Sequence, residues 1–142
     1  MKIEAYAKVN LTLEVFAERS DGYHALRSIV QQISLSDTLE ITEADGFFCD
    51  TGFNDDLCLK AARTLAKATG VNKGASIKVQ KRIPVGGGLG GGSADAAAGM
   101  IALNEIWGLN KSIDELVKIA ALIGSDVPAL TLGGTVLMQG RG

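Results

Sequence analysis

The start of the chain alternates apolar and polar residues in the manner of a β-strand. Between residues 9 and 15 every second residue is apolar, and this period of two predicts a strand with one half-buried face. The apolar positions of that face are Val9, Leu11, Leu13 and Val15. Lys8 and Asn10 are then expected to share the opposite, polar face.

More strand-like runs follow along the chain. Residues 24–33 and 38–42 both have this character, and Ser36-Asp37 between them has the composition of a turn. Residues 75–80 alternate again, and residues 135–138 read as a returning strand.

Three helices are predicted by apolar residues that recur three and four positions apart. Their expected bounds are 56–69, 92–107 and 112–123. Asp56 fits the cap of the first helix, and the pair Ser112 and Glu115 fits the capping box of the third. In the second helix, Trp107 and the stripe around Met100 are assigned to the core. Strands and helices grouped in blocks, with hairpin-like strands first, indicate an α+β fold.

Composition narrows the class of protein. A chain of 142 residues with 46% hydrophobic content is expected to form one domain around one core. The net charge of −2 arises from 14 basic and 16 acidic residues spread along the chain, which argues against nucleic acid or anionic lipid as a partner. A small-molecule partner is therefore expected.

The cysteines and the apolar segments indicate in which cellular compartment the protein is expected. Cys49, Cys58 and His24 are too few for a structural zinc site, and two cysteines do not form a disulfide framework, so a reducing cytoplasm is expected. The charged start does not fit a signal peptide, and Asp126, Pro128 and glycines interrupt the most apolar stretch. No membrane association is expected.

A cluster of six glycines between residues 86 and 92 is the first functional signal. The cluster and its flanks consist of Pro84, Val85, Gly86, Gly87, Gly88, Leu89, Gly90, Gly91, Gly92 and Ser93. Glycines let backbone amides approach an anion closely, and the helix that follows adds unsatisfied amides and a positive dipole end. We therefore expect this segment to bind the phosphates of ATP, with the Ser93 hydroxyl as a further donor.

Other interpretations of the glycines fit the sequence less well. A flexible linker would not run straight into a well-patterned helix. A Walker A loop is excluded, because no Gly-Lys-Ser/Thr follows. Gly86, Gly88 and Gly91 do fit the Rossmann spacing, but the next element is another helix rather than the second strand that a dinucleotide site needs. A hydrolase built on Ser93 is disfavoured, because the closing glycine of a nucleophile elbow is missing.

Three separated segments resemble the superfamily of galactokinase, homoserine kinase, mevalonate kinase and phosphomevalonate kinase. They are residues 7–11 with 21–24, residues 84–97, and residues 124–128 with Gly133-Gly134 and Gly140-Arg141-Gly142. The glycine segment marks the superfamily, whereas Lys-x-Asn and Asp-Gly-Tyr-His mark members that phosphorylate a cytidine-diphosphate-linked sugar alcohol in the non-mevalonate isoprenoid pathway. Departures from the family pattern fall at Asp56, Ala94 and Ala129.

The resemblance implies a fold and a domain. The fold is a two-layer sandwich of the ribosomal-protein-S5 domain 2-like type. Such kinases are longer and carry a second domain, so residues 1–142 are expected to be the ATP-binding N-terminal domain without the C-terminal one. The expected cofactors are ATP and Mg²⁺, and no residue is assigned as a metal ligand.

The same resemblance implies the catalytic roles. Asp126 is the general base for the 2-hydroxyl of the acceptor, and Lys8 orients that carboxylate and stabilises negative charge. Lys81 lies near the adenine. Without the resemblance, a turn residue that caps the next segment is the minor alternative for Asp126, whereas solvated lysines are a nearly equal alternative for Lys8 and Lys81.

The acceptor-binding residues are implied in the same way. Asn10 positions a phosphate or hydroxyl of the substrate, while Tyr23 stacks on the cytosine and His24 hydrogen-bonds to its edge. A histidine in a turn is otherwise often an ordinary surface residue. Two alternative functions stay open: a nucleotide-binding module without catalysis, and a kinase for another small alcohol such as mevalonate or homoserine.

Overall fold

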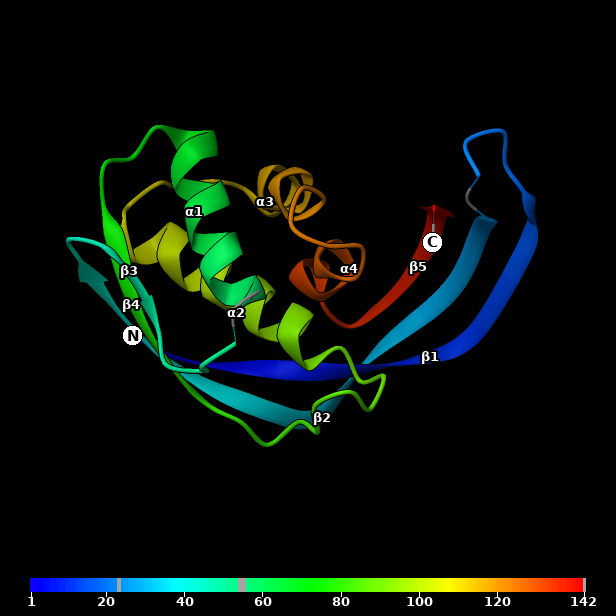
Figure 1. The fold of residues 1–142 in the computed structure, drawn as a ribbon, viewed down its shortest axis with the longest axis horizontal. Helices are drawn as coiled ribbons and strands as arrows, with labels where there is room; N and C mark the ends of the chain where they lie inside the picture. The colour runs from blue at the N-terminus through cyan, green and yellow to red at the C-terminus, as the bar shows by residue number, and fades with distance from the viewer. Residues whose placement is uncertain (23, 54–55, 142) are drawn as a thin grey trace.

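The computed structural model describes residues 1–22, 24–53 and 56–141. Its strands are β1 (Lys2–Glu18), β2 (His24–Ala44), β3 (Phe47–Cys49), β4 (Gly74–Gln80) and β5 (Thr135–Arg141). Its helices are α1 (Leu57–Thr69), α2 (Gly91–Ile106), α3 (Ile113–Ala120) and α4 (Val127–Leu132). The helices lie together on one side of a single sheet, so the expected two-layer α+β architecture is confirmed (Figure 1).

The long strand β2 organises the sheet. β1 pairs with it antiparallel along one edge, and the other edge is shared by two strands, β4 beside residues 38–44 and β5 beside residues 25–31. β3 then pairs with β4 in parallel, and the crossover between them contains α1. Beyond the helices the ends of β1 and β2 continue with β5 as a curved, projecting arm (Figure 1).

The turn predicted at Ser36-Asp37 is wrong, because β2 runs unbroken from His24 to Ala44. Asp37 is fully buried, and its carboxylate accepts hydrogen bonds from the backbone amides of Arg82 and Ile83 and from Lys81. A buried charge is tolerated when it is paired and hydrogen-bonded. Tertiary partners that are distant in sequence therefore override the turn propensity of the pair.

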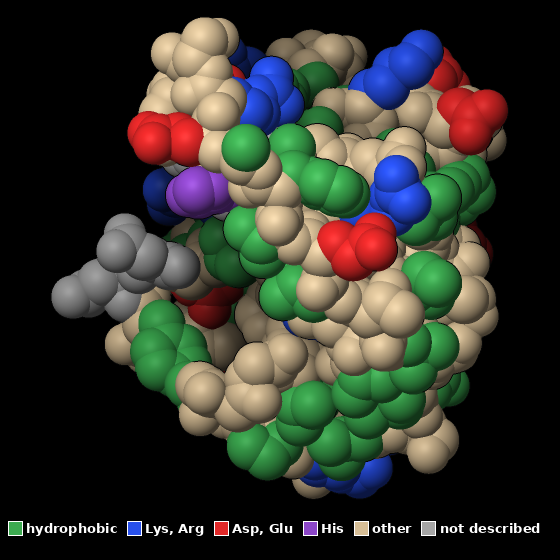
Figure 2. Space-filling model, turned by 90° about the vertical axis from the view of Figure 1, so that its right-hand side faces the viewer, with side chains coloured by type: hydrophobic (Ala, Val, Ile, Leu, Met, Phe, Trp, Pro, Cys, Tyr) green, Lys and Arg blue, Asp and Glu red, His purple; other side chains and the backbone are tan. Residues whose placement is uncertain are grey.

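The shared buried face predicted between residues 9 and 15 is also wrong. Leu11, Leu13 and Val15 are 59%, 57% and 59% exposed. The pairing of β1 with β2 shifts register between Asn10 and Thr12, and such a bulge changes which residues point to which face. Apolar side chains accordingly gather on the side of the molecule from which the arm projects (Figure 2).

The helices follow the sequence closely. Asp56 caps α1 by accepting from the amides of Cys58 and Leu59, and the Ser112–Glu115 capping box of α3 is present as predicted. α3 is shorter than expected, because residues 121–123 form a turn rather than a helix. The short helix α4 was not predicted.

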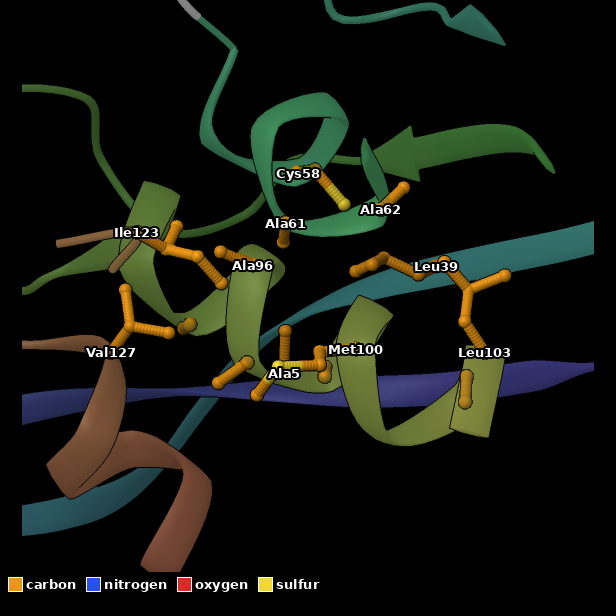
Figure 3. Packing of buried hydrophobic residues seen from close by; sticks show 14 of the residues in the cluster. Ala5, Leu39, Cys58, Ala61, Ala62, Ala96, Met100, Leu103, Ile123 and Val127 are labelled. Atoms are coloured by element: carbon orange, nitrogen blue, oxygen red, sulfur yellow. The ribbon is translucent and has the colours of Figure 1, made fainter. Parts of the chain in front are cut away.

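The core lies between α2 and the sheet, with α1 packed against α2 (Figure 3), and Leu116 and Ala120 of α3 also belong to it. α2 is rich in alanine and glycine, so it approaches its neighbours closely: a Cβ at Gly99 would lie 2.9 Å from the Cys58 sulfur on α1. Trp107 belongs to this core, as predicted, and its indole N–H donates to the carbonyl of Gly74 over 3.3 Å. Among the described residues, no helix is long and apolar enough to cross a membrane.

Candidate active site

The glycine segment forms one wall of a cavity of about 200 Å³ between β4 and α2. The opposite wall comes from the segment before α1 and from the first turn of α1 itself, including Thr51, Phe53, Asp56 and Leu57. The ten residues from Pro84 to Ser93 were predicted to bind ATP, and all of them except Ser93 line this cavity. Ser93 is half-buried in the first turn of α2.

α2 begins directly at the end of the glycine segment. The first intrahelical bond runs from the amide of Ala94 to the carbonyl of Gly90 over 2.8 Å. The amides of residues 91–93 precede that bond and have no carbonyl of their own helix to donate to. Several donors at the positive end of a 16-residue helix dipole can bind a phosphate.

The glycine segment also contacts β1. The backbone amide of Lys8 donates to the carbonyl of Leu89 over 2.9 Å. Gly90 adopts a left-handed conformation with φ of 70°, and a Cβ built there would lie 3.0 Å from both Cγ and Cε of Lys8. The lysine side chain therefore packs directly over a glycine that cannot be enlarged without moving it.

Lys8 and Asp126, which are 118 positions apart in sequence, meet in space. The Nζ atom of Lys8 lies 3.6 Å from Oδ2 of Asp126, and the two side chains are 7% and 33% exposed. Asp126 occupies the N-cap position of α4, yet its side chain makes no capping hydrogen bond to that helix, all of which lies in the described part of the chain. A role as a simple helix cap is therefore excluded, and the lysine is the partner of this carboxylate.

The turn before Asp126 is held from both sides. Val127 is fully buried in the core and Pro128 stands in the first turn of α4, where proline is well tolerated. On the other side, the ammonium of Lys60 on α1 donates to the carbonyl of Ile123 over 2.7 Å. These contacts fix where the Asp126 carboxylate lies.

A second cavity, of about 520 Å³, opens beside the Lys8–Asp126 pair. Both residues line it, together with Asn10, Ser28 and apolar side chains of the arm and of α4: Leu13, Leu26, Pro128, Leu132, Val136 and Met138. Lys8 and Asn10 thus do lie on one side of the sheet, as predicted. Leu13 is on that side as well because of the register shift after Asn10.

Polar side chains lead from this cavity along β2. The buried hydroxyl of Ser28 lies 2.6 Å from the carbonyl of Thr12 and 3.1 Å from the amide oxygen of Asn10. By strand alternation His24 shares a face with Ser28 and Leu26, but it does not line the cavity. Its Nδ1 atom lies 3.1 Å from the carbonyl of Phe16, at the tip of the arm. Tyr23 lies outside the described residues.

Lys81 lies at the base of the glycine cavity between two acids. Its ammonium contacts Asp37 of β2 at 2.5 Å and Asp95 of α2 at 2.9 Å. Burial raises the pKa of Asp95 to about 7, against the lowering effect of Lys81. Although burial acts to raise the pKa of Asp37, its hydrogen bonds hold that pKa below the usual value.

Sequence reasoning predicted Lys81 as a site residue but missed the two acids that contact it. Asp37 was interpreted as a turn residue, and only the fold shows what it binds. Asp95 carried a weak signal, since it is a lone acid among the alanines at 94 and 96–98, but it lies outside the apolar stripe that was predicted for this helix. The described residues contain no group of three or more histidine, cysteine, aspartate or glutamate side chains arranged to hold a metal ion.

The site thus has two chambers with a common boundary. One chamber offers backbone amides suited to polyphosphate, and the other offers a carboxylate that can accept a proton beside a lysine that can offset negative charge. The boundary is Lys8 and the glycine segment. This arrangement suits transfer of a phosphoryl group between two bound molecules.

Comparison with known proteins agrees with this geometry. The family model of the GHMP kinases N terminal domain matches residues 56–134. The 4-diphosphocytidyl-2-C-methyl-D-erythritol kinase of Caldanaerobacter subterraneus subsp. tengcongensis is 45% identical over 100% of this chain and 52% of the relative. The protein of the same name from Paramagnetospirillum magneticum is 47% identical over 99% of this chain and 52% of the relative.

A solved structure extends the likeness to the fold. The crystal structure of a 4-(cytidine 5′-diphospho)-2C-methyl-D-erythritol kinase superposes with a TM-score of 0.86 at 36% identity, over 99% of this chain and 52% of that one. The expected S5-like sandwich and the resemblance seen in the sequence are confirmed. The chain spans about half the length of the curated relatives it matches.

Proposed function

Because the chain belongs to the GHMP kinase family, we propose that it is the ATP-binding N-terminal domain of a small-molecule kinase. The proposed reaction transfers the γ-phosphoryl group of ATP to the 2-hydroxyl of 4-(cytidine 5′-diphospho)-2-C-methyl-D-erythritol. The relatives that are 45–47% identical to the whole chain carry the name of this kinase, which supports the choice of acceptor.

One observation carries the proposal: Lys8 lines the larger cavity, here called the acceptor chamber, and also packs against the glycine segment that lines the smaller one. Its backbone amide and side chain contact the glycine segment at Leu89 and Gly90, and its ammonium lies 3.6 Å from Asp126 in the acceptor chamber. Phosphoryl transfer asks a protein mainly to align an acceptor oxygen with the γ-phosphate and to offset developing charge. A lysine at the boundary meets both requirements.

The proposed chemistry assigns each group one role. Asp126 accepts the proton of the acceptor hydroxyl as that oxygen bonds to the γ-phosphorus, and the bond from the γ-phosphorus to the bridging oxygen breaks to release ADP. Lys8 keeps the carboxylate in place and offsets charge on the transferred group. The amides of residues 86–93 hold the phosphates of ATP, and Lys81 supplies a fixed positive charge at the base of that chamber. Mg²⁺ enters with ATP as the substrate complex.

The acceptor chamber suits a long ligand. Ser28 and His24 are four residues apart on one face of β2, a span of about 13 Å in a strand. We assign Asn10 to a phosphate or hydroxyl near the reacting end, and His24, with Tyr23, to the cytosine at the arm. The apolar side chains between them are suited to the carbon chain of the sugar alcohol. The two free cysteines, Cys49 and Cys58, are in keeping with a cytoplasmic protein.

The proposal is tested by measuring ATP affinity and product formation on the same preparation. Calorimetry should detect MgATP binding, and phosphorus NMR should detect ADP and the phosphorylated acceptor. Asp114→Asn, an exposed change on α3 outside both chambers, serves as the control.

Each negative result has its own meaning. Absence of ATP binding would refute the nucleotide site. Binding without turnover of any acceptor would favour the module without catalysis. Turnover of mevalonate or homoserine that a cytidine nucleotide fails to inhibit would refute the choice of acceptor.

A further inference from the structure

Asp95 is a buried acid that folding alone does not explain. It is 4% exposed on α2, and its neighbours on the helix are the alanines at 94 and 96–98. Its Oδ2 atom contacts Lys81 at 2.9 Å, whereas its Oδ1 atom is buried without a hydrogen-bond partner among the described residues. A buried oxygen left unpaired destabilises a protein and calls for a reason.

The other acid beside Lys81 has such a reason. Asp37 accepts from Lys81 and from the amides of Arg82 and Ile83, so it anchors the segment that follows β4 to the middle of β2. Asp37 also supplies Lys81 with one carboxylate, and one carboxylate is enough to neutralise the charge of the Lys81 ammonium. The second carboxylate is superfluous for pairing, and its burial opposes ionisation.

The position of Lys81 explains what Asp95 adds. A Cβ built on Gly91 would lie 3.2 Å from the ammonium, so Lys81 rests against the first residue of α2. Asp95 is on the same first turns of α2 and lines the glycine cavity together with Lys81. Two carboxylates on different elements, β2 and α2, restrict the position of the Lys81 ammonium more than a single carboxylate would.

We propose that Asp95 is a positioning residue for the nucleotide, which holds the Lys81 ammonium against the start of α2 where the phosphates are to bind. This inference rests on the proposed function. It predicts that Asp95 opposes stability while it favours ATP binding, a trade-off typical of functional groups in buried sites.

The test compares Asp95→Ala, Asp95→Asn and the exposed control Asp45→Ala at pH 8, using calorimetry with MgATP and urea denaturation of the same chain. Asp95→Ala should weaken ATP binding about tenfold. Asp95→Asn should recover part of that loss, because its amide oxygen still accepts from Lys81. Both should unfold at the same or a higher urea concentration than the parent chain, whereas Asp37→Asn should unfold at a lower one.

Unchanged ATP affinity in Asp95→Ala would overturn the inference. So would a fall in affinity together with a fall in stability, because that pattern belongs to a purely structural residue. If the parent chain binds no ATP, the proposed function itself fails. That result is distinguishable, since it does not depend on any substitution.

Discussion

Replacing Gly90 with alanine tests whether the glycine segment and Lys8 act as one unit. The change forces a non-glycine residue into a left-handed conformation, with φ of 70°, which destabilises the folded chain by roughly 1–2 kcal/mol. It also places a methyl group 3.0 Å from Cγ and Cε of Lys8, closer than carbon atoms normally approach. Either the lysine side chain or the segment has to move.

The consequence for catalysis follows from the contacts of Lys8. Its backbone is tied to Leu89, so the displacement falls mainly on the side chain and widens the 3.6 Å separation from Asp126. A misplacement of about 1 Å in an aligned site can lower the rate about a hundredfold. We expect Gly90→Ala to lower kcat by about ten- to a hundredfold.

The matched control is Gly108→Ala. Gly108 has φ of 66°, but nothing lies within 4 Å of a Cβ built there, and it is outside both chambers. Urea denaturation should report a similar loss of stability for the two variants, while ADP release at saturating substrates should fall only for Gly90→Ala. Equal rates in the two variants would refute the proposed coupling through Lys8.

Three further predictions follow from single contacts. Asp126→Asn should lower the rate about 10²–10⁴-fold without changing ATP affinity, and turnover near the parent rate would exclude this carboxylate as the base. Gly74→Ala should destabilise the chain by about 3 kcal/mol or more in urea denaturation, because its Cβ would lie 2.2 Å from the carbonyl oxygen of Gly46, and a smaller loss would mean that the β2–β3 turn yields. In the unfolded chain Asp95 loses its proton near its ordinary pKa of 3.8, whereas in the folded chain it keeps the proton up to about pH 7. As the pH rises from 5 to 7, the free energy of unfolding should therefore fall, by at most about 1.4 kcal/mol per pH unit. Asp95→Asn should flatten that dependence, and an equally steep fall in the variant would assign it to another group.

The helices α1, α2 and α3 were predictable because their signals are local, whereas the short α4 was not predicted. Asp56 and the Ser112–Glu115 pair cap their helices through bonds within four residues, and the apolar spacing of α1 and α2 needs no knowledge of the fold. The strands were harder. A single register shift after Asn10 places Leu13 on the face of the sheet opposite to the predicted one. No pattern of residues in the sequence predicts such a shift.

The site divides in the same way. The glycine segment was predictable from its local sequence. The resemblance to known kinases predicted Lys8, Asn10 and Asp126 as site residues, and the fold brings these three to one cavity. That Lys81 sits between Asp37 and Asp95 depends on contacts 44 and 14 residues apart in sequence. Such pairings are set by tertiary packing, so the chain alone could not reveal them.

The backbone hydrogen bond from Lys8 to Leu89 couples the glycine segment to β1, and this coupling constrains how proteins with this arrangement evolve. A lineage that reshapes the glycine segment to accept a different phosphate donor also shifts the strand that carries the ammonium. Donor preference and acceptor preference are then inherited together, and compensating substitutions are expected on β1 whenever residues near Leu89 change.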